Sequence, residues 1–154
     1  MNILETVKKN KEKMLEDMQG LLRIDSTFVE SDSPEAPFGE GIRASLDYVL
    51  ALGEQMGFKV KNVKNVAGHI EFGEGEEIVG ILCHVDVVPA VGNWKYPPFS
   101  GTISEGRIYS RGASDDKGPT IASLYALKAL KDMGAEIIVT PIKDNKVDLK
   151  YLMK

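Results

Sequence analysis

Apolar residues recur with a helical period in three stretches of the chain. In residues 3–24, apolar side chains return every three or four positions with Lys and Glu between them, which predicts an amphipathic helix. The same spacing predicts helices over residues 40–56 and 120–133. Gly57 and Gly134 directly follow these two stretches, where glycine commonly ends a helix. The pattern therefore predicts three helices spread over the chain.

Shorter apolar or alternating stretches between the helices predict strands. They cover residues 58–63, 67–72, 78–87, 101–109 and 136–139. The stretch 78–87 is almost continuously apolar, which is typical of a central strand buried on both faces. Segments rich in Gly, Pro, Ser and Asp predict loops over residues 25–39, 89–100 and 110–119. Alternating strands and helices favour an α/β fold with a central mixed sheet flanked by helices.

Composition narrows the class of protein. The 154 residues are enough for one domain with a hydrophobic core. The net charge of −4 argues against a nucleic-acid partner, because such proteins usually carry a basic face. No apolar run approaches the roughly 20 residues of a membrane helix, and residues 1–18 lack the apolar segment of a signal peptide. Cys83 is the single cysteine, which excludes a disulfide within the chain and suits the reducing cytoplasm. From these features together we expect a cytoplasmic protein that binds neither nucleic acid nor membrane.

The first candidate for chemistry lies at the end of the apolar stretch 78–87. His84 and Asp86 are two positions apart, so in a strand they face the same side. Open α/β sheets place ligands at this end of their strands. A histidine that binds a metal commonly donates its second ring N–H to a carboxylate, and Asp86 is placed to accept it. The alternative is a core histidine that is hydrogen-bonded to an aspartate at the end of a strand.

The second candidate is the loop before the third predicted helix, with the sequence RGASDDKGP over residues 111–119. Asp115 and Asp116 are adjacent carboxylates, and divalent cations favour such oxygen ligands. Gly112 and Gly118 allow the backbone to approach a ligand closely. The alternative is a solvated turn whose aspartate caps the helix. Taken separately, neither candidate distinguishes a metal site from an ordinary structural role.

Together the two candidates resemble one superfamily. The runs CHVDVVP, NWKYPPFSG and GRIYSRGASDDKGP resemble the co-catalytic zinc peptidases, which include PepV-type dipeptidases, carnosinases, carboxypeptidase G, acetylornithine deacetylase and succinyl-diaminopimelate desuccinylase. The paired aspartates before Lys-Gly-Pro look most like the PepV-type branch. The resemblance covers residues 1–134 and implies the N-terminal part of the catalytic domain. The fold it implies is a partial α/β/α sandwich of the zinc-peptidase type.

The resemblance also implies a role for each matching residue. His84 matches a zinc ligand. Asp86 matches the carboxylate that orients this histidine, and the resemblance implies that Asp86 is a catalytic residue. Asp115 matches the ligand that bridges two zinc ions, and Asp116 follows it through a peptide bond that is typically cis. In such sites a zinc-activated water hydrolyses the peptide bond of a small peptide substrate. We therefore expect Zn²⁺ as the cofactor and a cis bond between the two aspartates.

Neighbouring residues have supporting or structural interpretations. Lys117 either balances the aspartate charges, bonds a backbone carbonyl or is solvated, and Arg111 anchors the loop through its guanidinium. Cys83, inside the apolar stretch, is expected to be a buried and inert thiol. His69 is expected to be structural or surface-exposed. Trp94, with the aromatic residues Tyr96 and Phe99, either lines a substrate pocket or packs the loop against the domain.

The resemblance stops after Gly134, and residues 135–154 form a divergent tail. The Glu-Glu pair that supplies the general base and a further ligand in the family does not follow, and no lid domain is expected. We therefore expect a truncated, inactive portion of a dipeptidase. Two alternatives stay open, an N-acyl amino acid deacylase of the same superfamily and a non-catalytic fragment that binds a partner. An incomplete sheet also predicts a homo-oligomer formed through exposed apolar surface.

Overall fold

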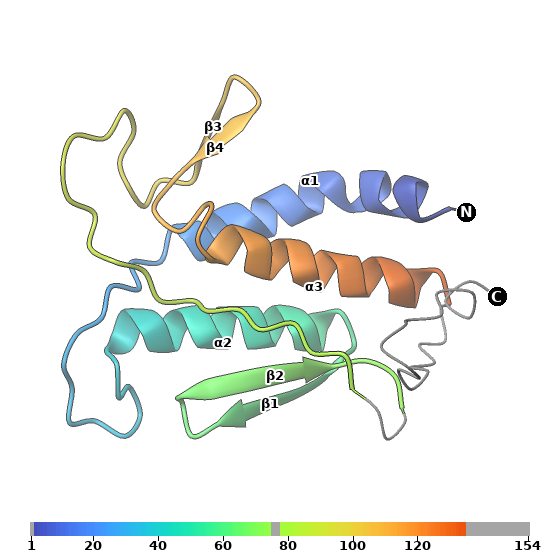
Figure 1. Cartoon of the computed structure of the whole chain (residues 1–154), viewed down its shortest axis with the longest axis horizontal. Coiled ribbons are helices and arrows are strands. Elements are labelled where there is room, and N and C mark those ends of the chain that lie inside the picture. Colours follow the sequence, from blue (N-terminus) through green and yellow to red (C-terminus); the bar gives the residue numbers. More distant parts are fainter. Residues whose placement is uncertain (1, 75–77, 135–154) are drawn as a thin grey trace, which may run out of the picture.

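The computed structural model describes residues 2–74 and 78–134, which form three helices and two β-hairpins (Figure 1). The helices are α1 (Ile3–Leu22), α2 (Glu40–Gln55) and α3 (Lys117–Asp132), and the strands are β1 (Lys59–Val63), β2 (Ala67–Glu71), β3 (Thr102–Ser104) and β4 (Arg107–Tyr109). All three predicted helices are confirmed. None of the helices within these ranges is long and apolar enough to cross a membrane.

The helix ends have local causes. Asn2 begins α1 with a capping box, because its side chain accepts from the N–H of Glu5 while the Glu5 carboxylate accepts from the N–H of Asn2. Helix α3 begins at Lys117, three residues before the predicted start. Pro119 fits there because the first turn of a helix has no internal partner for its N–H groups. Helix α3 ends at Asp132, and Gly134 shortly after it has a positive φ of 66°, which is typical of a glycine that ends a helix.

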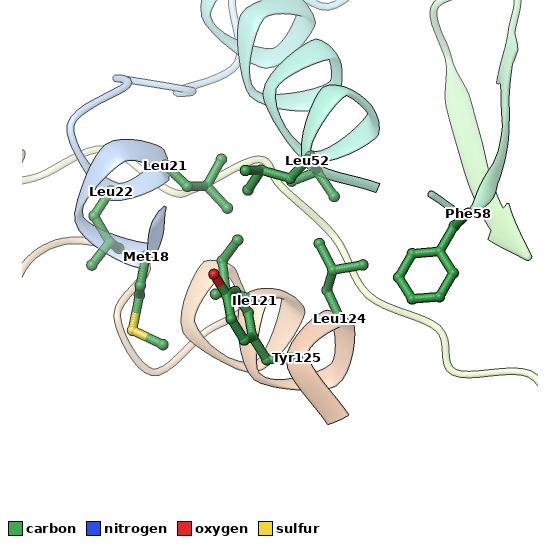
Figure 2. Packing of buried hydrophobic residues seen from close by; sticks show 9 residues of the cluster. Met18, Leu21, Leu22, Leu52, Phe58, Ile121, Leu124 and Tyr125 are labelled. Carbon is green, nitrogen blue, oxygen red and sulfur yellow. The ribbon is translucent and has the colours of Figure 1, made fainter. Parts of the chain in front are cut away.

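The core lies between the helices α1 and α3, which pack side by side, and helix α2, which contributes Leu52 to it (Figure 2). The largest apolar contributors come from all three helices and from the start of the β1–β2 hairpin: Met18, Leu21, Leu22, Leu52, Phe58, Ile121, Leu124 and Tyr125. Tyr125 carries a polar end into this core, and its hydroxyl donates to the Asp17 carboxylate at 2.6 Å. The α1–α3 pair is therefore joined by apolar burial and by buried hydrogen bonds, of which the Tyr125–Asp17 bond is one.

Strands β1 and β2 form an antiparallel hairpin against α2, which confirms the predicted strands at 58–63 and 67–72. Small residues allow this close packing. A Cβ atom on Gly53 of α2 would lie 2.7 Å from the Ile70 side chain, and one on Gly68 of β2 would lie 2.7 Å from Leu50. The hairpin therefore approaches α2 through glycine on both sides.

The prediction of one strand over residues 101–109 is wrong. The segment is a hairpin in which β3 pairs antiparallel with β4, with Ile103 opposite Ile108. Glu105 and Gly106 form the turn with φ of 53° and 73°. Two successive residues with positive φ are typical of a tight hairpin turn that matches the strand twist. The polar residues 104–107, which include Gly106, interrupt the apolar positions, so the turn has a signal in the sequence that the single-strand prediction overlooked.

The prediction of a buried central strand over residues 78–87 is also wrong. The segment contains no strand in its described residues, and only Val87 joins an isolated parallel bridge, to Thr27. Ile78 and Leu82 are 88% and 98% exposed, since no described strand or helix covers them. The two hairpins are thus separate small sheets within the described ranges. The predicted strand at 136–139 lies outside the described residues.

Candidate metal site

The His84 imidazole lies between two carboxylates. Its Nε2 is 2.9 Å from Oδ1 of Asp115, on the loop before α3. Its Nδ1 is 3.2 Å from Oδ1 of Asp86 and 3.2 Å from the Asp86 carbonyl oxygen. The structure therefore brings together the two predicted ligands, His84 and Asp115, although 31 positions separate them in the chain. Asp86 lies on the other ring nitrogen, where the sequence pattern expects an orienting carboxylate.

The charges around His84 favour its protonated form. Partial burial pulls the pKa of the imidazole down, but the hydrogen bond with Asp115, the contact with Asp86 and both negative charges together raise the pKa above its usual value. In the absence of a cation, an imidazolium placed between carboxylates is stabilised by their charge. A cation that binds here must displace that proton, because a metal ligand histidine is neutral.

The Asp115–Asp116 peptide bond is cis, as predicted. The carboxylates of Asp115 and Asp116 both contact His84, one at its ring and the other at its backbone. Asp115 faces the His84 ring, while Oδ2 of Asp116 accepts from the backbone N–H of His84 at 3.1 Å. The hydroxyl of Thr120 on α3 donates to the Asp116 carbonyl at 2.7 Å and to the His84 carbonyl at 3.4 Å. The loop and the His84 segment are therefore linked directly.

Lys117 is completely buried, so the expectation of a solvated lysine is wrong. Its Nζ donates to the carbonyl oxygens of Leu21 and Ile24, at 3.2 and 2.6 Å, where α1 ends. This contact confirms the alternative that Lys117 bonds backbone carbonyls. Burial lowers the pKa of its ammonium to about 8, and the negative charge of Asp25 only partly opposes this effect.

Arg111 anchors the loop, as predicted. Its Nη2 donates to the Pro89 carbonyl at 3.3 Å, and its guanidinium lies 5.1 Å from the centre of the Trp94 ring. Its backbone N–H donates to the Pro98 carbonyl at 2.6 Å. Arg111 therefore ties the Asp115 loop to the segment that follows His84 and to the aromatic loop beyond it.

A cavity of about 160 Å³ opens beside the histidine and is lined by His84, Asp86, Arg111, Ser114 and Asp115, among others. This volume corresponds to several water molecules. A wider hollow of about 640 Å³ is formed by residues 90 and 92–98. Trp94 connects the two, because it lines the wider hollow and lies against Arg111 of the smaller one.

Two aromatic residues of that loop line the wider hollow, and one of them also packs the loop against the domain, while a role toward substrate stays a prediction. Trp94 and Tyr96 line the wider hollow, while the Tyr96 ring also packs on Tyr109, with ring centres 5.1 Å apart. The Tyr96 hydroxyl donates to Ser104 at 3.0 Å and so ties the loop to β3. The hollow is therefore walled by side chains that also hold the loop on the β3–β4 hairpin.

The donor atoms fit a divalent cation only in part. Imidazole nitrogen and carboxylate oxygen are both zinc ligands. Across residues 2–74 and 78–134, however, no group of three His, Cys, Asp or Glu side chains is arranged to hold a metal ion. His84 and Asp115 form a pair of candidate ligands, because Asp86 lies on the opposite ring nitrogen. The described residues thus supply part of a coordination sphere.

The prediction for Cys83 is wrong, whereas that for His69 is confirmed. Cys83 is half-buried instead of enclosed in a strand, because the segment around it lacks a covering sheet. His69 is exposed on β2, where its Nδ1 lies 2.6 Å from Glu71, as expected of a surface histidine. Sequence reasoning missed Ser26, whose hydroxyl donates to the Val85 carbonyl at 2.6 Å. A serine in a polar loop gives no signal of this contact.

Comparison with known proteins supplies the context for this geometry. Residues 80–141 match the family described as "Peptidase family M20/M25/M40". A Bacillus subtilis (strain 168) protein named "Putative dipeptidase YtjP" is 54% identical over 134 residues, which are 86% of this chain and 29% of that protein. A Staphylococcus epidermidis (strain ATCC 12228 / FDA PCI 1200) protein named "Putative dipeptidase" is 47% identical over 130 residues, 84% of this chain and 28% of that protein.

The crystal structure of human carnosine dipeptidase 1 is similar in fold, with a TM-score of 0.66 at 21% identity over 86% of this chain and 31% of that one. The chain therefore spans less than a third of the length of these relatives. The matches confirm the resemblance that the sequence motifs predict, to the N-terminal portion of dipeptidases in the zinc-peptidase superfamily. They also confirm an α/β fold of that type.

Proposed function

We propose that this chain, which resembles the N-terminal portion of a PepV-type dipeptidase, contributes His84 and Asp115 as ligands to a zinc site that hydrolyses dipeptides. The observation that carries the proposal is the 2.9 Å contact between the His84 ring and the Asp115 carboxylate. Asp86 would hold the ring in orientation from its other nitrogen. A bound zinc ion supplies a Lewis acid and lowers the pKa of its water to about 7.

A zinc titration by calorimetry tests the ligand pair. Purified protein is stripped with a chelator, and His84→Ala and Asp115→Asn are expected to abolish the binding heat. His69→Ala is a matched control, because His69 also contacts a carboxylate, Glu71, on an exposed surface. Asp86→Asn is expected to weaken binding by about 10–100-fold, since it removes the partner of a ligand. Binding that survives His84→Ala but disappears in His69→Ala would contradict the proposal.

The 154-residue chain by itself is proposed to bind zinc weakly and to have little or no dipeptidase activity. A catalytic zinc site normally takes three protein ligands, and the described residues supply two. The test incubates the zinc-loaded chain with a panel of dipeptides and, in parallel, with N-acetyl and N-succinyl amino acids. Robust dipeptide turnover that a chelator stops would refute the inactivity. Turnover of the acylated substrates alone would instead support the deacylase alternative.

We also propose that the chain associates with itself through the apolar residues 78–82. Ile78 and Leu82 are 88% and 98% exposed, and the segment has no described strand beside it. Exposed apolar strands without partners commonly pair with other chains. Leu82→Glu is expected to shift the protein toward monomer in light scattering. Leu4→Glu, at a leucine 59% exposed on α1, should leave the mass unchanged. Equal masses for the wild type and both variants would refute this surface.

A cytoplasmic location is proposed as well, because the single cysteine and the acidic composition suit a reducing compartment. Cell fractionation with a tagged chain tests it, and recovery in a secreted or membrane fraction would contradict it.

A further inference from the structure

We infer that residues 21–26, the last two residues of α1 and the four that follow, are a brace that sets the spacing between His84 and Asp115. Its positioning residues are Ser26, which lies in the brace, and Lys117, which binds to it. The inference rests on the proposed metal site and adds how that site is held. The hydrogen bonds of the His84 ring go to Asp86 and Asp115, and the side chains of Ser26 and Lys117 bond to backbone carbonyls instead. Each connects the brace to one of the two segments that carry a candidate ligand.

Ser26 holds the His84 segment. It is completely buried, its hydroxyl donates to the Val85 carbonyl at 2.6 Å, and its own carbonyl accepts from the N–H of Val87 at 3.1 Å. These two bonds lie on either side of Asp86 and immediately after His84. Since the described part of the segment 78–87 has no strand ladder, its position depends on such single contacts. Loss of the Ser26 hydroxyl would remove the donor to this partly buried carbonyl.

Lys117 holds the other segment. It lies two positions after Asp115 and is completely buried. Its Nζ donates to the carbonyl oxygens of Leu21 and Ile24. The last carbonyls of a helix lack partners further along the helix, and a cation there is favoured by the helix dipole. The Leu21 carbonyl also accepts from the Ile24 N–H at 3.3 Å, so Lys117 adds a second donor to it. The Asp115 loop is therefore fixed to the same six residues that hold the His84 segment.

The direct contacts between the two segments complete the arrangement. The Asp116 carboxylate accepts from the His84 N–H, and Thr120 donates to the His84 carbonyl. The brace, the His84 segment and the Asp115 loop thus contact one another in pairs. Removal of a brace contact should allow the His84–Asp115 spacing to change, although both candidate ligands are still present.

The test compares Ser26→Ala with Ser45→Ala. Ser45 is a matched control, since it is completely buried and its hydroxyl has no hydrogen-bond partner among the described residues. The first readout is the ring ¹⁵N chemical shift of His84 in metal-free protein, with His69 as an internal reference. The second is zinc affinity by calorimetry. We expect Ser26→Ala to change the His84 shifts and to weaken zinc binding by about 10–100-fold, as loss of an outer-shell support does. Ser45→Ala should change neither.

A second pair of variants tests the brace from the Asp115 side and does not depend on Ser26→Ala folding. Lys117→Met is compared with Lys131→Met, because Lys131 also donates to two carbonyls at a helix end, those of Met56 and Gly57. We expect changed His84 shifts only in Lys117→Met. Unchanged His84 shifts in the folded Ser26 or Lys117 variant would overturn the inference. If the wild type fails to bind zinc, the metal-free shifts still decide on the brace, and only the proposed function fails.

Discussion

Lys117 should make the protein more stable as the pH rises from about 7 to about 10. Its ammonium is completely buried, and burial lowers its pKa from 10.5 to about 8. An unfolded chain exposes this lysine to water, where the pKa returns to the ordinary value. Between these two pKa values the unfolded state therefore binds more protons than the folded state, and the free energy of unfolding increases with pH.

The size of the effect follows from the gap between the two pKa values. At about pH 7 both states are protonated, and the buried charge costs about 3 kcal/mol relative to an ordinary lysine. At about pH 10 the folded state carries a neutral amine, and roughly 2 kcal/mol of that cost has disappeared. The two hydrogen bonds persist, because a neutral amine retains two N–H groups for the carbonyls of Leu21 and Ile24.

Urea denaturation of metal-free protein at about pH 7 and pH 10 measures this difference. Other groups also titrate in this range, so the quantity of interest is the wild-type change minus the change in Lys117→Met. We expect the wild type to gain about 2 kcal/mol relative to the variant. Lys131→Met controls for the loss of a lysine that donates to two carbonyls. A wild-type stability that falls relative to Lys117→Met with rising pH would refute the buried-ammonium reasoning.

Two further predictions concern stability. Tyr125→Phe should lower the free energy of unfolding by about 1.5–3 kcal/mol, because it removes a donor from the buried Asp17 carboxylate. Tyr96→Phe, which loses a bond between two neutral hydroxyls, should cost less in the same urea titration, and equal losses would count against the reasoning. Gly106→Ala should cost about 1 kcal/mol, because φ is 73° while no atom of the described part of the chain obstructs a Cβ. Gly80→Ala, with equally open space and no positive φ, should cost less, as thermal denaturation would show.

The sequence predicted those elements whose stabilisation is local. The helices at 3–24 and 40–56 appear within two residues of their predicted ends, because their apolar period matches the face that they bury. Strands β1 and β2 were predicted from their short apolar stretches, whereas their pairing as a hairpin was found only in the structure. The strand predicted over 78–87 is absent from the structure. An apolar run alone does not specify whether a neighbouring strand is present to pair with it. Strand identity depends on such non-local partners, and the described ranges offer this segment only the single bridge from Val87 to Thr27.

The candidate site divides in the same way. His84 and Asp86, and likewise Asp115 and Asp116, are recognisable because each pair is contiguous or nearly so in the sequence. Ser26 is not recognisable from the sequence, because its partner Val85 lies 59 positions away and the residues around Ser26 predict only a polar loop. Lys117 was visible as part of the motif, but its partner Leu21 is 96 positions distant, so its burial could not be predicted. The candidate ligands are thus apparent from local motifs, whereas the contacts of the segments that carry them depend on the packed fold. If the brace acts as inferred, substitutions at Ser26 should impair the site while both motifs remain intact.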